Sequence, residues 1–147
     1  MWMPVWLSYL ARANSEIGQF DTARRCIGEA LAAVDTAKER WCEAEVNRIA
    51  GEIALMSPEP HPAKAEAYFA HALAVAREQR AKSWELRAAM SMARLWRDQG
   101  RRPQAHDLLA SVQGCFTEGL STLDLRQAKA ILDELADVAR PSEEAFR

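Results

Sequence analysis

The chain has 147 residues, of which 49% are hydrophobic and 27% are charged, as is usual for one folded domain or a short array of repeats. Its net charge of -2 argues against a general nucleic-acid-binding protein, because such proteins normally carry a large basic excess. No apolar run is long enough for a membrane-spanning helix, and the apolar N-terminus lacks the basic start of a signal peptide. We therefore expect a cytoplasmic protein with neither a nucleic acid nor a membrane as partner.

The histidines and cysteines do not form a pattern of known chemistry. The three histidines lie far apart and no two cysteines have CxxC spacing, so neither a metal site nor a disulfide framework is indicated. A phosphate-binding loop of the GxxxxGK[ST] type is also missing. We predict buried free cysteines, His71 and His106 on helix surfaces, and a protein that is not an enzyme and has no metal, cofactor or catalytic residue of its own.

Apolar residues recur three and four positions apart in seven successive segments, which predicts an all-α chain. The expected helices cover residues 4–16, 21–39, 40–56, 63–79, 83–100, 103–119 and 122–139. Gly18 and Gly100 follow the first and fifth segments, where a residue free to take positive φ often ends a helix. Asp21 is a candidate N-cap, the prolines in residues 57–62 exclude a helix there, and residues 141–147 are expected to fray.

The segment of residues 83–100 is apolar around most of its circumference. A surface helix normally buries one stripe, whereas this pattern leaves only one polar stripe. We expect the helix to be sandwiched between neighbours, with Trp84 and Trp96 in the core. The polar stripe consists of Arg87, Ser91 and Arg94, with Arg97 beside it.

The helices also repeat in pairs spaced about 40 residues apart. After each turn comes a small residue, then a large apolar residue four positions on and a small or β-branched residue seven positions on. These triplets are Ala23, Ile27, Ala30; Ala65, Phe69, Ala72; and Ala105, Leu109, Val112. A further small residue (Ala11, Gly51 or Ala93) stands in the preceding helix. We interpret the small residues as close crossings of antiparallel helices, and the large residue as filling the gap beside each crossing.

One such pair cannot bury its apolar face alone, so several must stack. We predict three repeats, over residues 4–39, 40–80 and 82–119, and a capping helix over residues 122–139. Together they would form a single domain over residues 1–140.

The pattern over residues 7–112 resembles the tetratricopeptide repeat, in a version longer than the usual unit of about 34 residues. The proline expected after each second helix is missing, and the second repeat has an expanded turn. The resemblance implies antiparallel helix pairs stacked as a right-handed superhelix. The first helix of each pair would line a concave groove.

A narrower resemblance covers residues 38–135. It rests on the segments ERWCEAEVNRIAGEIAL, AEAYFAHALAVAREQRAKSWELRAAMSMARLWRDQGRRPQAHDLLASV and FTEGLSTLDLRQAKAILDEL. These are similar to the C-terminal repeat region of large bacterial signalling proteins. Those proteins join a class III adenylate/guanylate cyclase or a DNA-binding activator domain to a predicted signal-transduction ATPase. The resemblance implies a non-catalytic regulatory module, with any cyclase or ATPase activity in separate upstream domains.

Polar residues of the first helices are the candidate partner-binding groove. They are Tyr9, Arg12, Glu45, Arg48, Glu52, Arg87, Ser91, Arg94 and Arg97, with Ser8 and Ser15 beside the first two. Arginines suit bidentate recognition of carboxylates or phosphates. The leading hypothesis is a scaffold that binds a protein segment, or another domain of the same signalling protein, and the alternative is a sensor of a small anionic effector.

Two further possibilities remain open. The polar stripes could be ordinary solvated faces, with Glu45 or Glu52 paired to Arg87 or Arg94 across repeats, and such surface pairs contribute little to stability. Trp2 and Trp6 could pack on a preceding repeat, or drive formation of a homodimer if they are exposed.

Overall fold

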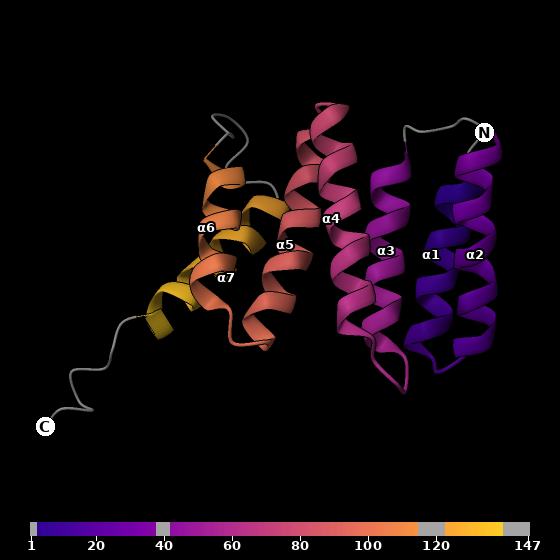
Figure 1. Cartoon of the computed structure of the whole chain (residues 1–147), viewed down its shortest axis with the longest axis horizontal. Coiled ribbons are helices and arrows are strands. Elements are labelled where there is room, and N and C mark those ends of the chain that lie inside the picture. The colour runs from indigo at the N-terminus through magenta and orange to yellow at the C-terminus, as the bar shows by residue number, and fades with distance from the viewer. Residues whose placement is uncertain (1–2, 38–41, 115–122, 140–147) are drawn as a thin grey trace, which may run out of the picture. The chain divides into compact units, whose positions relative to one another are not determined.

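The computed structural model describes residues 3–37, 42–114 and 123–139, and these residues contain helices and no strand, which confirms the all-α prediction. The helices are α1 (Met3–Glu16), α2 (Phe20–Ala37), α3 (Glu43–Met56), α4 (Pro62–Glu78), α5 (Lys82–Asp98), α6 (Arg102–Gln113) and α7 (Leu123–Ala139) (Figure 1). The chain divides into two compact units, Met1–Ala88 and Ala89–Arg147. The boundary between them falls within α5.

Two predicted helix ends are wrong. Asp21 does not cap α2, because the first hydrogen bond of that helix runs from the Ala23 N–H to the Gln19 carbonyl at 3.0 Å. Asp21 lies instead in the first turn, where a carboxylate is favourable near the positive end of the helix dipole. The second case is α6, which ends at Gln113 with Gly114 as its C-cap, before the predicted end near Gly119. Residues 115–122, including Cys115, lie outside the described residues.

Three turns share one hydrogen-bond pattern. Gly18, Arg80 and Gly100 follow α1, α4 and α5 with φ values of 84°, 56° and 81°. In each turn the residue with positive φ donates to a carbonyl three positions back, and the next residue donates to a carbonyl five positions back. This is the Schellman arrangement, which satisfies the last free carbonyls of a helix. Gly18 and Gly100 therefore end their helices as predicted, and Arg80 does so without being glycine.

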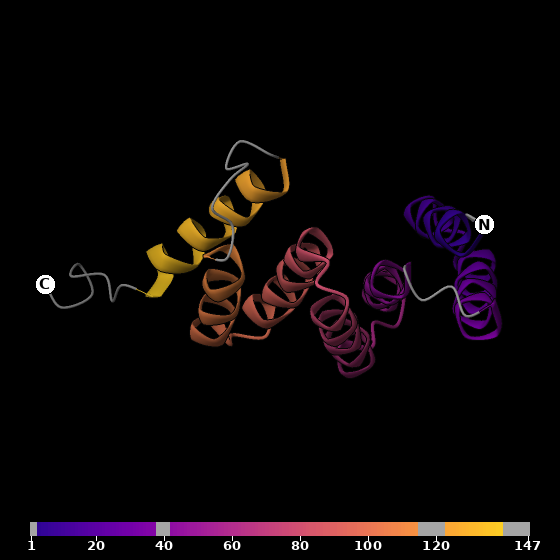
Figure 2. The ribbon, with the colours of Figure 1, turned by 90° about the horizontal axis from the view of Figure 1, so that it is seen from above.

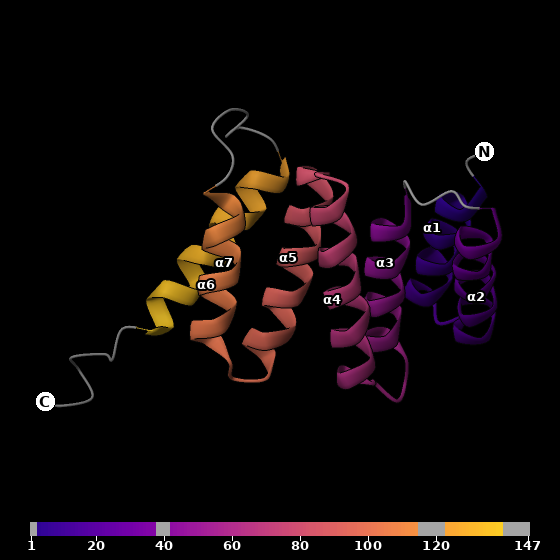
Figure 3. The same cartoon turned by 45° about the horizontal axis from the view of Figure 1, so that its top comes forward.

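The first unit is centred on α3, which packs against α1, α2 and α4. Figures 1 and 3 show α3 between the pair α1–α2 and α4, and Figure 2 looks down on the ends of these helices. Every residue from 42 to 51 is buried. The main core cluster consists of Ala11, Ala23, Cys26, Ile27, Ala30, Val34, Cys42, Val46, Ile49, Ala50 and Ile53. The sequence pattern predicted that α5 is the enclosed helix, and it did not predict that α3 is buried.

The predicted close crossing is present between α3 and α4. A Cβ atom at Gly51 would lie 2.5 Å from Cε1 of Phe69, so the aromatic ring occupies the space that a side chain at position 51 would need. The small residues that mark the other crossings are also buried: Ala11, Ala23, Ala65, Ala93 and Ala105 are all 0% exposed. The assignment of small residues to buried positions is therefore confirmed.

The aromatic residues of α5 are less buried than predicted. Leu86, Ala88, Ala89, Met90, Met92, Ala93 and Leu95 are buried, which confirms the broad apolar face. Trp84 and Trp96 are only half-buried. Trp84 packs against the main core cluster and against a smaller cluster of Ala44, Val75 and Ala76. The guanidinium of Arg101 lies 4.7 Å from the centroid of the Trp96 ring. In the second unit α6 packs against α7, with Leu109, Val112, Leu125 and Leu135 buried.

Candidate partner-binding face

The candidate residues on α3 form one tightly bonded group. Glu45, Arg48 and Glu52 are three and four positions apart, so they share a face of the helix. Nε of Arg48 donates to Oε2 of Glu45 at 3.2 Å, and Nη2 bonds to the other oxygen of the same carboxylate. Nη1 of Arg48 donates to Oε1 of Glu52 at 2.7 Å. The guanidinium of Arg48 is thus held by two carboxylates of its own helix.

Arginines from two other helices extend this group. Nη1 of Arg12, on α1, lies 3.2 Å from Oε2 of Glu52, and Nη1 of Arg87, on α5, lies 3.8 Å from Oε1 of Glu45. Arg12 also pairs with Glu16 at 3.4 Å. The result is a chain of alternating charges across α1, α3 and α5, which we call the ion-pair chain. The Glu45–Arg87 pair is one of the cross-repeat pairs that the alternative of ordinary solvated faces allowed, whereas Glu52 pairs with Arg12.

Burial divides the ion-pair chain into an inner and an outer part. The side chains of Glu45 and Arg48 are 1% and 10% exposed, whereas those of Arg12 and Arg87 are 42% and 38% exposed. Burial alone would lower the pKa of Arg48, but the hydrogen bond and charge of Glu45, together with the charge of Glu52, raise the pKa overall. Arg48 is therefore a fixed cation within the structure, and Arg12 and Arg87 are the arginines that a partner could reach.

The remaining candidates on α1 differ in accessibility. Tyr9 is 41% exposed and close enough to influence the pKa of Arg48. Ser8 and Ser15 are 0% and 3% exposed. These two serines are therefore not part of an exposed binding surface.

Three candidates, Ser91, Arg94 and Arg97, belong to the second unit. Ser91 is buried, and Arg94 and Arg97 are half-buried. Nε of Arg97 donates to Asp98 at 3.2 Å, and Nη1 donates to Glu134 of α7 at 3.1 Å. Arg97 therefore joins α5 to α7 within this unit.

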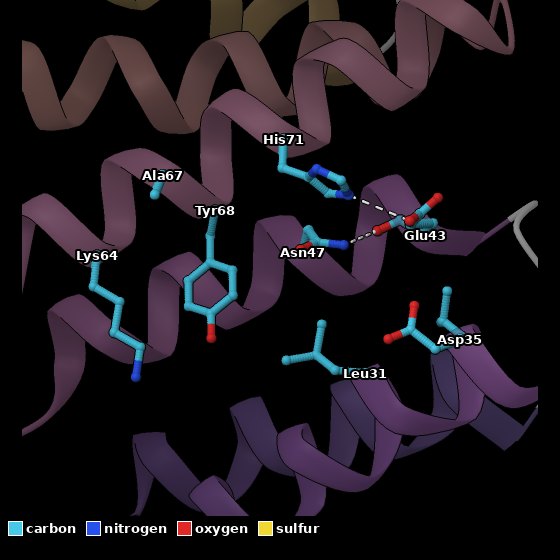
Figure 4. Close-up of a pocket in the computed structure, with 9 residues that line it drawn as sticks. Leu31, Asp35, Glu43, Asn47, Lys64, Ala67, Tyr68 and His71 are labelled. Carbon is cyan, nitrogen blue, oxygen red and sulfur yellow. Dashed lines mark hydrogen bonds and ion pairs between the residues drawn. The ribbon is translucent and has the colours of Figure 1, made fainter.

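On the opposite face of α3 there is a pocket that sequence reasoning missed. It is open, has a volume of about 510 Å³ and lies between α2, α3 and α4 (Figure 4). Nε2 of His71 pairs with Oε1 of Glu43 at 3.2 Å, and Nδ2 of Asn47 donates to the backbone carbonyl of Glu43 at 2.8 Å. The polar or charged lining residues are Asp35, Glu43, Asn47, Lys64, Tyr68 and His71. The sequence contains only a weak signal for this pocket. It consists of Glu43 and Asn47, which lie four positions apart and face away from Arg48.

The described residues do not combine into a recognisable metal site, since no group of three or more His, Cys, Asp or Glu residues among them could hold a metal ion. Cys26 and Cys42 are buried and free, as predicted. His71 is exposed, also as predicted. Across the described ranges, no helix combines the length and apolar character needed to cross a membrane.

Comparisons with known proteins give no family assignment. No model of a known protein family matches the chain, and no curated protein matches it either. The resemblances to tetratricopeptide repeats and to bacterial signalling proteins therefore stay predictions.

Proposed function

We propose that this protein is a non-catalytic interaction module that binds a protein segment, or a neighbouring domain of the same signalling protein. The binding surface would be the face of α1, α3 and α5 that carries the ion-pair chain. The observation that carries this proposal is the contrast in burial between Arg48, which is 10% exposed, and Arg12 and Arg87, which are 42% and 38% exposed. A buried, bonded centre would hold the surface rigid, and the outer arginines would make the contacts.

The chemistry of arginine supports a protein partner. A guanidinium has five N–H donors, so an arginine that already holds one carboxylate can bind a second one from a partner. Arginine is also enriched among the residues that dominate binding energy in protein interfaces. Since Arg12 and Arg87 come from different helices and are joined through Glu52, Arg48 and Glu45, a partner touching both would have to extend across α3.

We also propose that the helices form a right-handed superhelix of the tetratricopeptide type, as in the repeat regions of cyclase-linked or activator-linked signalling ATPases. Two features support this. Small residues are buried at equivalent positions of successive pairs, and Phe69 packs where Gly51 lacks a side chain. The module would transmit partner binding to other domains of such a protein.

The alternative function, sensing of a small anionic effector, receives less support. Arg48 is the most enclosed cation of the face, and two carboxylates already occupy its donors. An anion would have to displace one of them. A thermal-shift screen with nucleotides and organic acids tests this alternative, because a ligand that binds the native state raises the melting temperature.

The proposed function can be tested with peptides selected from a random display library for binding to the full chain. Affinities of the selected peptides would be measured by fluorescence anisotropy for the wild type and for the double variant Arg12→Gln/Arg87→Gln. Glutamine is chosen because a new carboxylate beside Glu45 or Glu52 would disturb the fold. We expect binding to weaken by about tenfold or more, roughly 1.4 kcal/mol.

The matched control is Arg25→Gln/Arg126→Gln, which removes the same charge from two exposed arginines on α2 and α7. We expect this control to stay within about twofold of the wild type, since exposed substitutions away from a site have small effects. Equal weakening in both double variants would indicate a general charge effect and would refute the proposed face. Unchanged binding in Arg12→Gln/Arg87→Gln would refute it as well.

A further inference from the structure

Large exposed apolar side chains gather on one side of α1 and at its end. Trp6, Tyr9, Leu10 and Ile17 are 66%, 41%, 52% and 73% exposed, and Ala13 between them is also exposed. The spacing of Trp6, Tyr9, Leu10 and Ala13 places these four residues within about 100° of the helix circumference, the width of a typical buried face, and Ile17 follows the end of the helix. We call these five residues the α1 apolar stripe. Single exposed apolar residues are common on protein surfaces, whereas apolar residues grouped on one face are typical of interaction sites.

The internal repeat identifies what this stripe corresponds to. Ala11 and Gly51 are the equivalent buried small residues of α1 and α3, the first helices of two successive pairs. Counting from these two positions aligns the stripe with residues of α3: Trp6 with Val46, Tyr9 with Ile49, Leu10 with Ala50, and Ala13 with Ile53.

On α3 that same face is fully covered. Val46, Ile49, Ala50 and Ile53 are between 0% and 5% exposed, and they belong to one core cluster with residues of α1 and α2. Both α1 and α2 pack against α3. The preceding helix pair therefore covers this face on α3, while the equivalent face on α1 is bare.

We propose that the α1 apolar stripe is the docking face for a further antiparallel helix pair, which would sit on α1 as α1 and α2 sit on α3. The sizes of the residues specify the partner further. Trp6 stands where α3 has Val46, and Leu10 stands where it has Ala50. Because protein interiors are close-packed, the partner pair must present smaller residues, such as Ala or Gly, opposite Trp6 and Leu10. The stripe thus selects a helix pair with an Ala-rich or Gly-rich contact face.

The test adds such a pair to the full chain. Residues 3–42, which contain α1, α2 and the natural connection to a following helix, are duplicated in front of Met3. Ile27 and Val34 share the main core cluster with residues of α3. In the duplicate, these two residues are kept or are replaced by alanine, singly and together, and Ala11 is kept. Trp6→Lys in the original α1 is then measured by urea unfolding with and without the duplicate.

In the unextended chain we expect Trp6→Lys to leave the urea midpoint nearly unchanged, since Trp6 is 66% exposed and exposed substitutions have small effects. In at least one extended chain it should lower the midpoint by about 1 M, because the side chain would then be buried. Ala74→Lys on the exposed side of α4 serves as the control and should have the same small effect in every background.

Two results would overturn the proposal. One is an equal effect of Trp6→Lys in the unextended chain and in all extended chains, which would mean that no helix pair covers the stripe. The other is a dimer of the unextended chain, detected by sedimentation, that Trp6→Lys converts to monomer, because a second copy would then be the occupant. Neither result depends on Arg12 or Arg87, so failure here is distinguishable from failure of the proposed binding face.

Discussion

Gly51 shows how a single residue sets the distance between two helices. The ring of Phe69 lies where the Cβ atom of any other residue at position 51 would be, because that Cβ atom would be 2.5 Å from Cε1 of Phe69. Phe69 itself is 0% exposed. In Gly51→Ala the ring or the helix must move, and overpacking of this kind costs about 1–3 kcal/mol. The better helix propensity of alanine offsets up to about 1 kcal/mol, so we expect a net loss in urea unfolding experiments.

Gly28 provides the matched control for this prediction. It lies within α2, and a Cβ built there would have no atom within 4 Å. Gly28→Ala should therefore gain up to about 1 kcal/mol of stability from helix propensity alone. A stabilising Gly51→Ala would show that α3 and α4 do not cross as closely as described.

Glu45 and Glu16 carry the same carboxylate in different surroundings. Glu45→Ala leaves Arg48 with one partner fewer in a buried position. Removing one member of a buried pair typically costs about 3–5 kcal/mol, and we expect the lower end because Glu52 remains. Glu16→Ala breaks a pair whose side chains are 42% and 55% exposed, so it should cost less than about 1 kcal/mol. Thermal or urea unfolding of the two variants measures the difference, and equal losses would contradict the division into inner and outer parts.

Sequence spacing could place Glu45, Arg48 and Glu52 on one face of a helix, but it could not show which of them are buried. Their burial depends on α1 and α5, which contribute Arg12 and Arg87 from about 40 residues away in either direction. Local periodicity contains no information about such distant neighbours. For the same reason Arg48 was a candidate for partner binding, although its donors are used within α3.

At the scale of helices and turns, Arg80 is the exception among the three residues that end a helix with positive φ. A non-glycine residue in the left-handed region costs roughly 1–2 kcal/mol, while glycine loses more conformational entropy on folding. We expect Arg80→Gly to raise stability by about 0.5–1 kcal/mol, as measured by thermal unfolding. Gly100→Ala at the equivalent position after α5, where φ is 81°, should lower stability by about 1–2 kcal/mol. A loss of stability in Arg80→Gly would mean that the arginine side chain contributes more than the backbone strain costs.

Helix positions were largely predictable because glycine, proline and three-four spacing act locally. The structure confirms, within a few residues, the helix ends that are marked by Gly18, by Gly100 and by the prolines of residues 57–62. Asp21 was misread because a side chain suited to capping is equally suited to the first turn of a helix. The central position of α3 was missed because polar residues such as Glu45 and Asn47 reduce the apolar character of a helix that is nevertheless enclosed.

At the scale of the whole molecule, the ion-pair chain and the main core cluster lie entirely within the first unit. The core cluster extends from Ala11 to Ile53, with Tyr68 and Trp84 packed against it, and the ion-pair chain ends at Arg87. The ion-pair chain, which is the proposed binding face, therefore ends before the boundary at Ala88, whereas the candidates Ser91, Arg94 and Arg97 lie beyond it. In contrast, the handedness of a superhelix is not encoded in any local pattern, which is why it remains a proposal.

A truncation series tests whether α5 completes this unit. We expect a fragment of residues 1–98 to fold cooperatively, because it contains both core clusters of the unit together with Trp84. A fragment of residues 1–80 lacks Trp84, the Arg77–Glu85 pair at 3.0 Å and the Arg87–Glu45 pair at 3.8 Å. Loss of a large aromatic residue from a core costs about 3–5 kcal/mol, and half-burial of Trp84 places the expected loss near the lower value.

Circular dichroism of the two fragments in urea would measure this difference in stability. Equal stability of the two fragments would mean that α5 contributes nothing to the packing of α3 and α4. Because a helical array gains stability mainly from contacts between neighbours, such a result would also argue against the proposed stacked array.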